Sequence, residues 1–145
     1  MRSPATARQP LRTADIEWTP AFYDVDPMLV VWHGHYLKFF ERARAALFGS
    51  FGYGYEDMAE SGYAWPIVDL RVKFVRPVRI GQRLKVHASL VEWENRVRVE
   101  YLVRDAQRGE VLTRGWSIQV AVDTASGEMQ YVCPPVLLRK LGLAP

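Results

Sequence analysis

The chain has 145 residues, of which 49% are hydrophobic and 24% are charged. This length fits one domain rather than two, and the composition is that of a globular protein, not of a disordered or membrane-spanning one. The net charge of +3 comes without a stripe of closely spaced Arg and Lys residues, so no nucleic-acid partner is expected. The longest apolar run, residues 28–32, is far too short to span a membrane.

The single cysteine, Cys133, excludes an intramolecular disulfide and favours a reducing, cytoplasmic location. Cys133 is far in sequence from any histidine, so a catalytic thiol is not expected. Residues 1–11 are rich in Arg, Ser, Ala and Pro and lack the apolar segment of a secretory signal. We expect a disordered tail over 1–11, followed by a single domain over 12–145.

The first element expected after the tail is a strand over 13–22. Ile16 and Trp18 alternate with polar neighbours there, and Pro20 indicates a strand end or an edge strand. A loop over 23–33 follows it.

Residues 34–48 have a helical pattern. The apolar face is marked by three large side chains, Leu37, Phe40 and Leu47. Further Phe and Ala residues broaden this face, and a helix that is apolar on most sides is mostly buried. Gly49 and Gly52 are expected to end the helix, with a loop or a short second helix over 53–62.

From residue 64 onward apolar and polar residues alternate, which is typical of strands. Four strands are expected, over 64–77, 84–90, 97–103 and 112–122. Short turns join them, so neighbouring strands should be antiparallel. A short helical turn is expected near the C-terminus. The predicted fold class is therefore α+β, with one sheet covering one apolar helix.

Between the first strand and the helix lies a dense polar cluster of Asp24, Asp26, His33 and His35, embedded among apolar residues. This segment runs into a helix N-terminus, where backbone N–H groups lack partners and can hold a developing oxyanion. Asp26 is surrounded in sequence by Val, Met, Leu and Trp, and a less solvated carboxylate is a stronger base or nucleophile. The arrangement suits acyl transfer to water.

The same segment resembles a known family. Its matching residues are Asp24-x-Asp26-Pro27, then residues 30–34, and Tyr36. They are similar to the signature of the 4-hydroxybenzoyl-CoA thioesterase branch of the hot-dog fold thioesterases. Three later segments also fit, residues 66–68, Phe74-x-x-Pro77-x-x-x-Gly81 and residues 134–138. The resemblance covers nearly everything after the tail. It implies a long antiparallel β-sheet wrapped around one central α-helix, and hydrolysis of an acyl- or aroyl-CoA thioester.

The resemblance also implies roles for particular residues. Asp26 would attack the thioester or activate a water, and the thioester carbonyl would bind to backbone N–H groups near His33 and Gly34. The His33 side chain would assist, as a histidine does in some relatives. Asp24 occupies an acidic position that is not expected to be catalytic. Leu29 stands where relatives often have Gly, and His35 where many have Asn; both departures bear on substrate identity.

Several residues are predicted to contact the substrate. Arg71 and Arg96 are candidate partners for the phosphates of CoA. Trp32 and Trp65 are candidates to line an acyl pocket. The family resemblance implies a homodimer or homotetramer in which sheets join edge to edge. In that assembly Asp26 would face Pro66, Ile67 and their neighbours from the other subunit.

The sequence leaves several alternatives open. The two histidines and two aspartates match no recurring zinc pattern, so no metal and no cofactor is expected, with CoA being part of the substrate.

Asp26 alone could be an ordinary turn residue, and His33 a structural one. The substrate could instead be an acyl-carrier-protein thioester. A dehydratase or hydratase pairing His33 with Asp26, or a non-catalytic acyl-CoA binding module, are further alternatives. The acyl group and the choice between dimer and tetramer stay open.

Overall fold

The structure is a computed structural model that describes residues 8–143. Its strands are β1 (Arg12–Trp18), β2 (Tyr63–Ala64), β3 (Ile67–Phe74), β4 (Leu84–Glu92), β5 (Val97–Asp105), β6 (Val111–Gln119) and β7 (Val122–Asp123). Its helices are α1 (Tyr36–Ser50), α2 (Tyr55–Ser61) and α3 (Pro135–Lys140), with 3-10 turns at Phe22–Asp24 and His33–His35. Within the described chain no helix is long and apolar enough to span a membrane.

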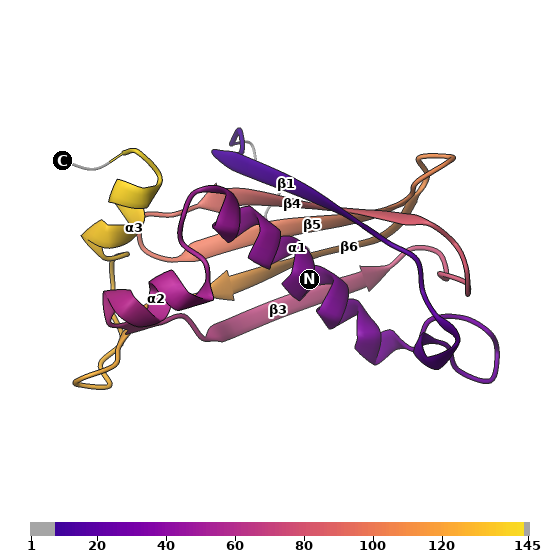
Figure 1. Ribbon diagram of the computed structural model, residues 1–145, viewed down its shortest axis with the longest axis horizontal. Helices are drawn as coiled ribbons and strands as arrows, with labels where there is room; N and C mark the ends of the chain where they lie inside the picture. Colours follow the sequence, from indigo (N-terminus) through magenta and orange to yellow (C-terminus); the bar gives the residue numbers. More distant parts are fainter. Residues whose placement is uncertain (1–7, 144–145) are drawn as a thin grey trace.

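Five strands form one antiparallel sheet in the order β1-β4-β5-β6-β3. α1 lies across one face of this sheet, and β3 forms one of its edges (Figure 1). The short strands β2 and β7 pair with each other in a second sheet. The structure therefore confirms the predicted α+β class, in which a long antiparallel sheet wraps around one main helix.

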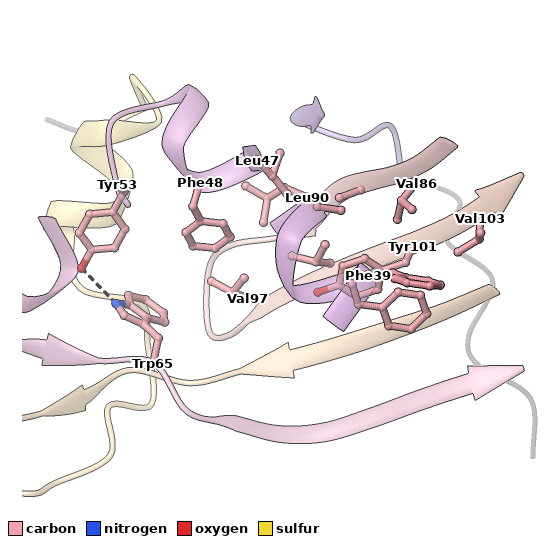
Figure 2. Packing of buried hydrophobic residues seen from close by; sticks show 14 of the residues in the cluster. Phe39, Leu47, Phe48, Tyr53, Trp65, Val86, Leu90, Val97, Tyr101 and Val103 are labelled. Atoms are coloured by element: carbon pink, nitrogen blue, oxygen red, sulfur yellow. Dashed lines mark hydrogen bonds between the residues drawn. The ribbon is translucent and has the colours of Figure 1, made fainter. Parts of the chain in front are cut away.

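The core lies between α1 and the inward-facing residues of the sheet. Phe39, Ala43 and Leu47 of α1 are fully buried. The ring of Phe40 stacks on that of Tyr101, with centroids 4.3 Å apart and an interplanar angle of 4°. Figure 2 shows Phe39 and Leu47 of α1 in one cluster with Val86 and Leu90 of β4 and Tyr101 of β5. The side of α1 that faces the sheet is buried as expected, whereas Leu37, which was predicted to belong to the apolar face, is 44% exposed on the solvent side of the helix.

Gly115 of β6 allows α1 to approach the sheet closely. A Cβ atom placed there would lie 2.5 Å from the carbonyl oxygen of Arg71 on β3 and 2.6 Å from a ring carbon of Phe40. Any larger residue would have to displace either the neighbouring strand or the helix. Gly115 therefore sets the spacing between the two layers, a role that the sequence pattern did not reveal.

Several element boundaries differ from the expected ones. β1 ends at Trp18 rather than at residue 22, because the chain turns at Pro20 into the loop that follows. α1 begins at Tyr36, after the 3-10 turn at His33–His35, and continues to Ser50. Gly49 thus lies inside the helix, whereas Gly52, with φ of 78°, lies beyond its end.

Two of the expected strands are each divided in two. The strand expected over 64–77 becomes β2 and β3, separated by Trp65 and Pro66. Proline has no N–H group to donate to a strand ladder, which favours a break at this point. The strand expected over 112–122 likewise becomes β6 and β7. The second helix and the C-terminal helical turn that the sequence predicted are both present.

Residues 1–7 of the tail expected over 1–11 lie outside the described residues. Of the remaining four, Arg8 pairs with the carboxylate of Glu94 and lies over the ring of Trp93, 3.8 Å from its centroid. The N–H of Leu11 donates to the carbonyl of Leu90, 2.9 Å away.

Candidate active site

The loop between β1 and α1 is folded into a tight hairpin. The N–H of Asp26 donates to the carbonyl of Val30, and the N–H of Leu29 donates to the carbonyl of Asp26, both at 2.9 Å. The hairpin is fixed to the segment that follows β3, because the N–H of Val31 donates to the carbonyl of Val78 at 2.7 Å. The backbone around Asp26 is thus held at a defined position beside the end of β3.

Asp24 joins the two ends of this hairpin. It is 3% exposed, and its carboxylate accepts a hydrogen bond from the N–H of Ala21 at 2.8 Å. Its carbonyl accepts the N–H of Trp32 at 3.0 Å. The carboxylate and the carbonyl of Asp24 thus each accept one backbone N–H group. Asp24 therefore holds the loop in shape.

Asp26 is half-buried and keeps part of its carboxylate free. Its Oδ1 accepts the N–H of Met28 at 2.8 Å, which orients the side chain within the turn. Among the described residues no hydrogen-bond donor contacts the other oxygen, Oδ2. The carboxylate is therefore both positioned and available to a water molecule or a substrate.

The start of the helix offers the unpaired N–H groups that the sequence predicted. The N–H of His35 donates to the carbonyl of Trp32 at 2.9 Å and so closes the first 3-10 turn. The N–H groups of His33 and Gly34 have no acceptor within residues 8–143. Two donors at one helix start, with the partial positive charge found there, form a suitable site for a carbonyl oxygen that becomes negative.

The indole ring of Trp32 covers this turn. A Cβ atom at position 34 would overlap the six-membered ring of Trp32, so only glycine leaves the ring in place. The ring centroid also lies 5.0 Å from that of His33 and 5.3 Å from that of His35. The His33 side chain is exposed, whereas the Nδ1 atom of His35 is buried without a partner among the described residues. Trp32 therefore packs against the turn that was predicted to hold the thioester carbonyl.

Leu29 holds a backbone conformation that favours glycine. Its φ is 63°, and within the described chain it is the one residue other than glycine with a positive φ. Its side chain is 53% exposed, so little packing would be lost by truncation. We expect Leu29→Gly to leave the free energy of unfolding unchanged or to raise it by up to about 1 kcal/mol, because the strain is removed. Chemical denaturation of both proteins measures this difference, with Met28→Gly in the same turn as control, which should be destabilising.

The other predicted site residues are not beside Asp26 within one chain. Trp65, Pro66 and Ile67 precede or begin β3, whereas the Asp26 hairpin contacts the segment after it. An eight-residue strand separates the two ends by about 26 Å. Trp65 is buried, and its indole N–H donates to the hydroxyl of Tyr53 at 3.0 Å (Figure 2).

The two arginines predicted to bind phosphate also lie apart from Asp26 along the chain. Arg71 is half-buried in the middle of β3. Arg96 is exposed beside the turn between β4 and β5, and its Nε lies 3.2 Å from a carboxylate oxygen of Glu92. One chain therefore does not gather all predicted substrate contacts at one place.

Cys133 does not provide an alternative nucleophile. The thiol is 5% exposed, and burial raises its pKa to about 12. It is therefore protonated near neutral pH and unreactive. Within the part of the chain that the structure describes, no group of three or more His, Cys, Asp and Glu side chains is arranged to hold a metal ion.

Comparison with known proteins agrees with this fold and with the sequence motif. The model of the thioesterase-like superfamily matches residues 20–141. A Synechocystis protein named as a candidate esterase is 32% identical over 114 residues, which cover 77% of this chain and 68% of the relative. A Bacillus subtilis protein named as a candidate acyl-CoA thioesterase is 28% identical over 105 residues, covering 72% of this chain and 76% of the relative.

Among solved structures, a 4-hydroxybenzoyl-CoA thioesterase variant in complex with 4-hydroxybenzoyl-CoA has a similar fold. Its TM-score is 0.78 at 19% identity, and the match covers 90% of this chain and 99% of that one. The helices, strands β2 to β7 and the loop that carries Asp26 fall within the family match, whereas β1 (Arg12–Trp18) precedes it. The chain belongs to the thioesterase-like superfamily and is a thioester hydrolase with the hot-dog fold of the acyl-CoA thioesterases.

Proposed function

We propose that this enzyme hydrolyses an acyl- or aroyl-CoA thioester to the free acid and CoA, with Asp26 as nucleophile or general base. The observation that carries this proposal is the pairing of a positioned carboxylate, with one oxygen free, and a helix start with two unpaired N–H groups. In this proposal the reaction needs no metal or redox cofactor, and CoA is part of the substrate. The proposed location of the enzyme is the cytoplasm.

The chemistry follows from these groups. The thioester oxygen would accept the N–H groups of His33 and Gly34, which stabilise the negative charge that forms when the carbonyl is attacked. As general base, Asp26 would take a proton from water while the water oxygen bonds to the carbonyl carbon. As nucleophile, it would form an anhydride that water then opens. In both cases the C–S bond breaks, and the CoA sulfur leaves and is protonated. The exposed His33 side chain would assist this proton transfer.

We infer further that the site is completed by a second copy of the chain. β3 is an edge strand, and its side chains Ile67, Val68 and Leu70 are exposed although apolar. An exposed apolar edge favours pairing with another strand. Antiparallel pairing of two β3 strands would bring the Pro66 end of one beside the Phe74 end of the other. Pro66 and Ile67 of the partner would then lie near Asp26, which they do not approach within one chain.

The remaining substrate contacts fit this assembly. Trp32 is half-exposed beside the predicted oxyanion site and would contact the acyl group. Trp65 would support Pro66 from within the core. Arg71 and Arg96 would contact the phosphates of CoA, as guanidinium groups bind phosphate well. A homotetramer would need a second interface in addition to this one.

Leu70→Pro tests the dimer. The N–H of Leu70 donates to the side chain of its neighbour Asp69, at 2.9 Å, so it is not needed for pairing with β6. Proline should therefore leave the monomer folded but block an added strand, since edge positions tolerate proline. We expect at least about a hundredfold weaker self-association, from the loss of a few backbone hydrogen bonds, together with loss of thioesterase activity. Light scattering and circular dichroism measure both, with Leu70→Ala as control. An active monomer would contradict the shared site.

The proposed reaction is tested by thiol release from short, long and aromatic acyl-CoAs, beside the same acyl groups on an acyl carrier protein. Turnover of at least one CoA ester, with a higher kcat/KM than the matched carrier-protein ester, is the expected result. The reverse preference would assign the carrier protein as substrate. Binding of CoA esters without turnover would favour a non-catalytic module.

A further inference from the structure

A cavity of about 240 Å3 lies where the C-terminal half of α1 meets α2 and the end of β6. It is lined by Arg44, Ala45, Phe48, Gly54, Tyr55, Met58 and Gln119. No residue of the Asp26 hairpin is among them. An apolar cavity of about 150 Å3 can hold a benzene molecule, so this one can accept a single substituted ring or a short acyl chain.

Arg44 brings a buried positive charge to this cavity. The residue is 8% exposed, and an arginine side chain stays protonated. Its Nη1 donates to the hydroxyl of Tyr101 at 3.1 Å. The approach of its Nη2 to the carboxylate of Glu41, at 3.9 Å, is too long for a hydrogen bond, and the Glu41 side chain is mostly exposed. Of the five N–H donors of the guanidinium, one is used within the described chain.

Gln119 adds an unpaired acceptor to the same cavity. The residue is 5% exposed, and its Nε2 donates to the carbonyl of Trp65 at 2.9 Å. This bond fixes which end of the amide is which, because a carbonyl can only accept. The Oε1 atom is left buried without a partner among the described residues. A buried acceptor without a partner is costly unless a ligand or water supplies one, and Arg44 beside it has N–H donors to spare after its bond to Tyr101.

The chemistry of this lining defines a ligand. Ala45, Phe48 and Met58 are apolar and suit a hydrocarbon body. The guanidinium of Arg44 suits a carboxylate, which it can bind through two parallel hydrogen bonds. The amide oxygen of Gln119 accepts from a water or hydroxyl bound beside that carboxylate. We propose that this cavity binds the distal end of the acyl group, and that this end carries a carboxylate.

The link to catalysis rests on the proposed function and its dimer. The bond from Gln119 to Trp65 places the cavity next to Pro66, at the start of β3. Figure 2 shows Phe48, Tyr53 and Trp65 gathered at this end of the core. In the antiparallel dimer this end lies beside Asp26 of the partner. A thioester bound there would extend its acyl group toward Arg44. The enzyme would thus select thioesters of dicarboxylic acids.

Kinetics with a matched substrate pair test this selection. Adipyl-CoA and hexanoyl-CoA have the same chain length and differ in the terminal carboxylate. For the wild type we expect kcat/KM to be at least about tenfold higher for adipyl-CoA, as one charge-assisted contact supplies this factor. Arg44→Met should abolish or reverse the ratio. Arg42→Met removes an exposed arginine of the same helix and should keep it. A wild-type preference for hexanoyl-CoA, or an unchanged ratio in Arg44→Met, overturns the proposal.

Binding of a free carboxylate tests the cavity even if no thioester is hydrolysed. In an NMR titration, benzoate should shift the side-chain resonances of Arg44 and Gln119 and bind at least tenfold more tightly than uncharged benzamide. Arg44→Met should remove this difference. Its folding is checked by thermal unfolding, and Arg44→Lys, which keeps the charge but loses the planar fork, gives a second variant with an intermediate loss. Equal binding of benzoate and benzamide overturns the cavity assignment. If benzoate binds selectively but no thioester is hydrolysed, the proposed reaction is overturned and the cavity assignment stands.

Discussion

Asp26→Asn is expected to lower kcat by about 10²–10⁴-fold, the usual contribution of a positioned acid–base group. The amide can still accept the N–H of Met28, so the hairpin and substrate binding should be retained. An amide oxygen is neither a base nor a nucleophile of useful strength, so the chemical step should be lost. Thiol release under saturating substrate gives kcat, and binding of a non-hydrolysable thioester analogue gives affinity.

Asp24→Asn is the matched control for this experiment. Asp24 lies two residues earlier in the same motif, but its side chain is buried and accepts a hydrogen bond from the N–H of Ala21. An amide oxygen can keep that hydrogen bond. We therefore expect kcat within a few-fold of wild type. If Asp26→Asn turned over at nearly the wild-type rate, or if both variants lost activity equally, Asp26 would not have the assigned role.

Gly115→Ala is expected to destabilise the fold by about 3 kcal/mol, at the upper end for overpacking of a core. The added methyl group would press on the Arg71 carbonyl and on the Phe40 ring, which is itself stacked on Tyr101. Neither the edge strand nor the helix can yield without losing other contacts. Urea denaturation of both proteins gives the difference in free energy.

Gly49→Ala is the control for that change. Gly49 lies inside α1, and a Cβ atom added there would meet no other atom within 4 Å. Alanine is favoured over glycine in a helix, so this variant should be more stable by about 0.5–1 kcal/mol. A neutral Gly115→Ala would show that helix and sheet can separate freely, in conflict with the packing described here.

The sequence was sufficient to predict the fold class and the position of the loop that carries Asp26. The helix could be recognised because its apolar residues repeat over 34–48, and the strands because apolar residues alternate. Asp26 could be singled out because two acidic and two histidine side chains stand in an apolar segment before a helix. These are local signals, and the structure places that segment at the start of α1 as expected.

Other features depend on residues that are distant in sequence and that only the tertiary structure brings together. Gly115 has no local signal, because its role depends on the carbonyl of Arg71 and the ring of Phe40. In the sequence, Arg44 looks like any other polar residue of the predicted helix, and only the structure shows that it is buried in the same cavity as Gln119. Its position between two alanines was the one feature of the sequence that could have indicated its burial.

The sequence by itself therefore determined the order of the elements and the acidic and histidine side chains that precede the helix. Both follow from periodicity and residue type. The tertiary structure decided which strand forms the edge and which oxygen of Asp26 is free. It also placed Trp65 and Pro66 far from Asp26 along β3. These facts depend on strand pairing and on close packing between segments many residues apart, and no local pattern records such contacts.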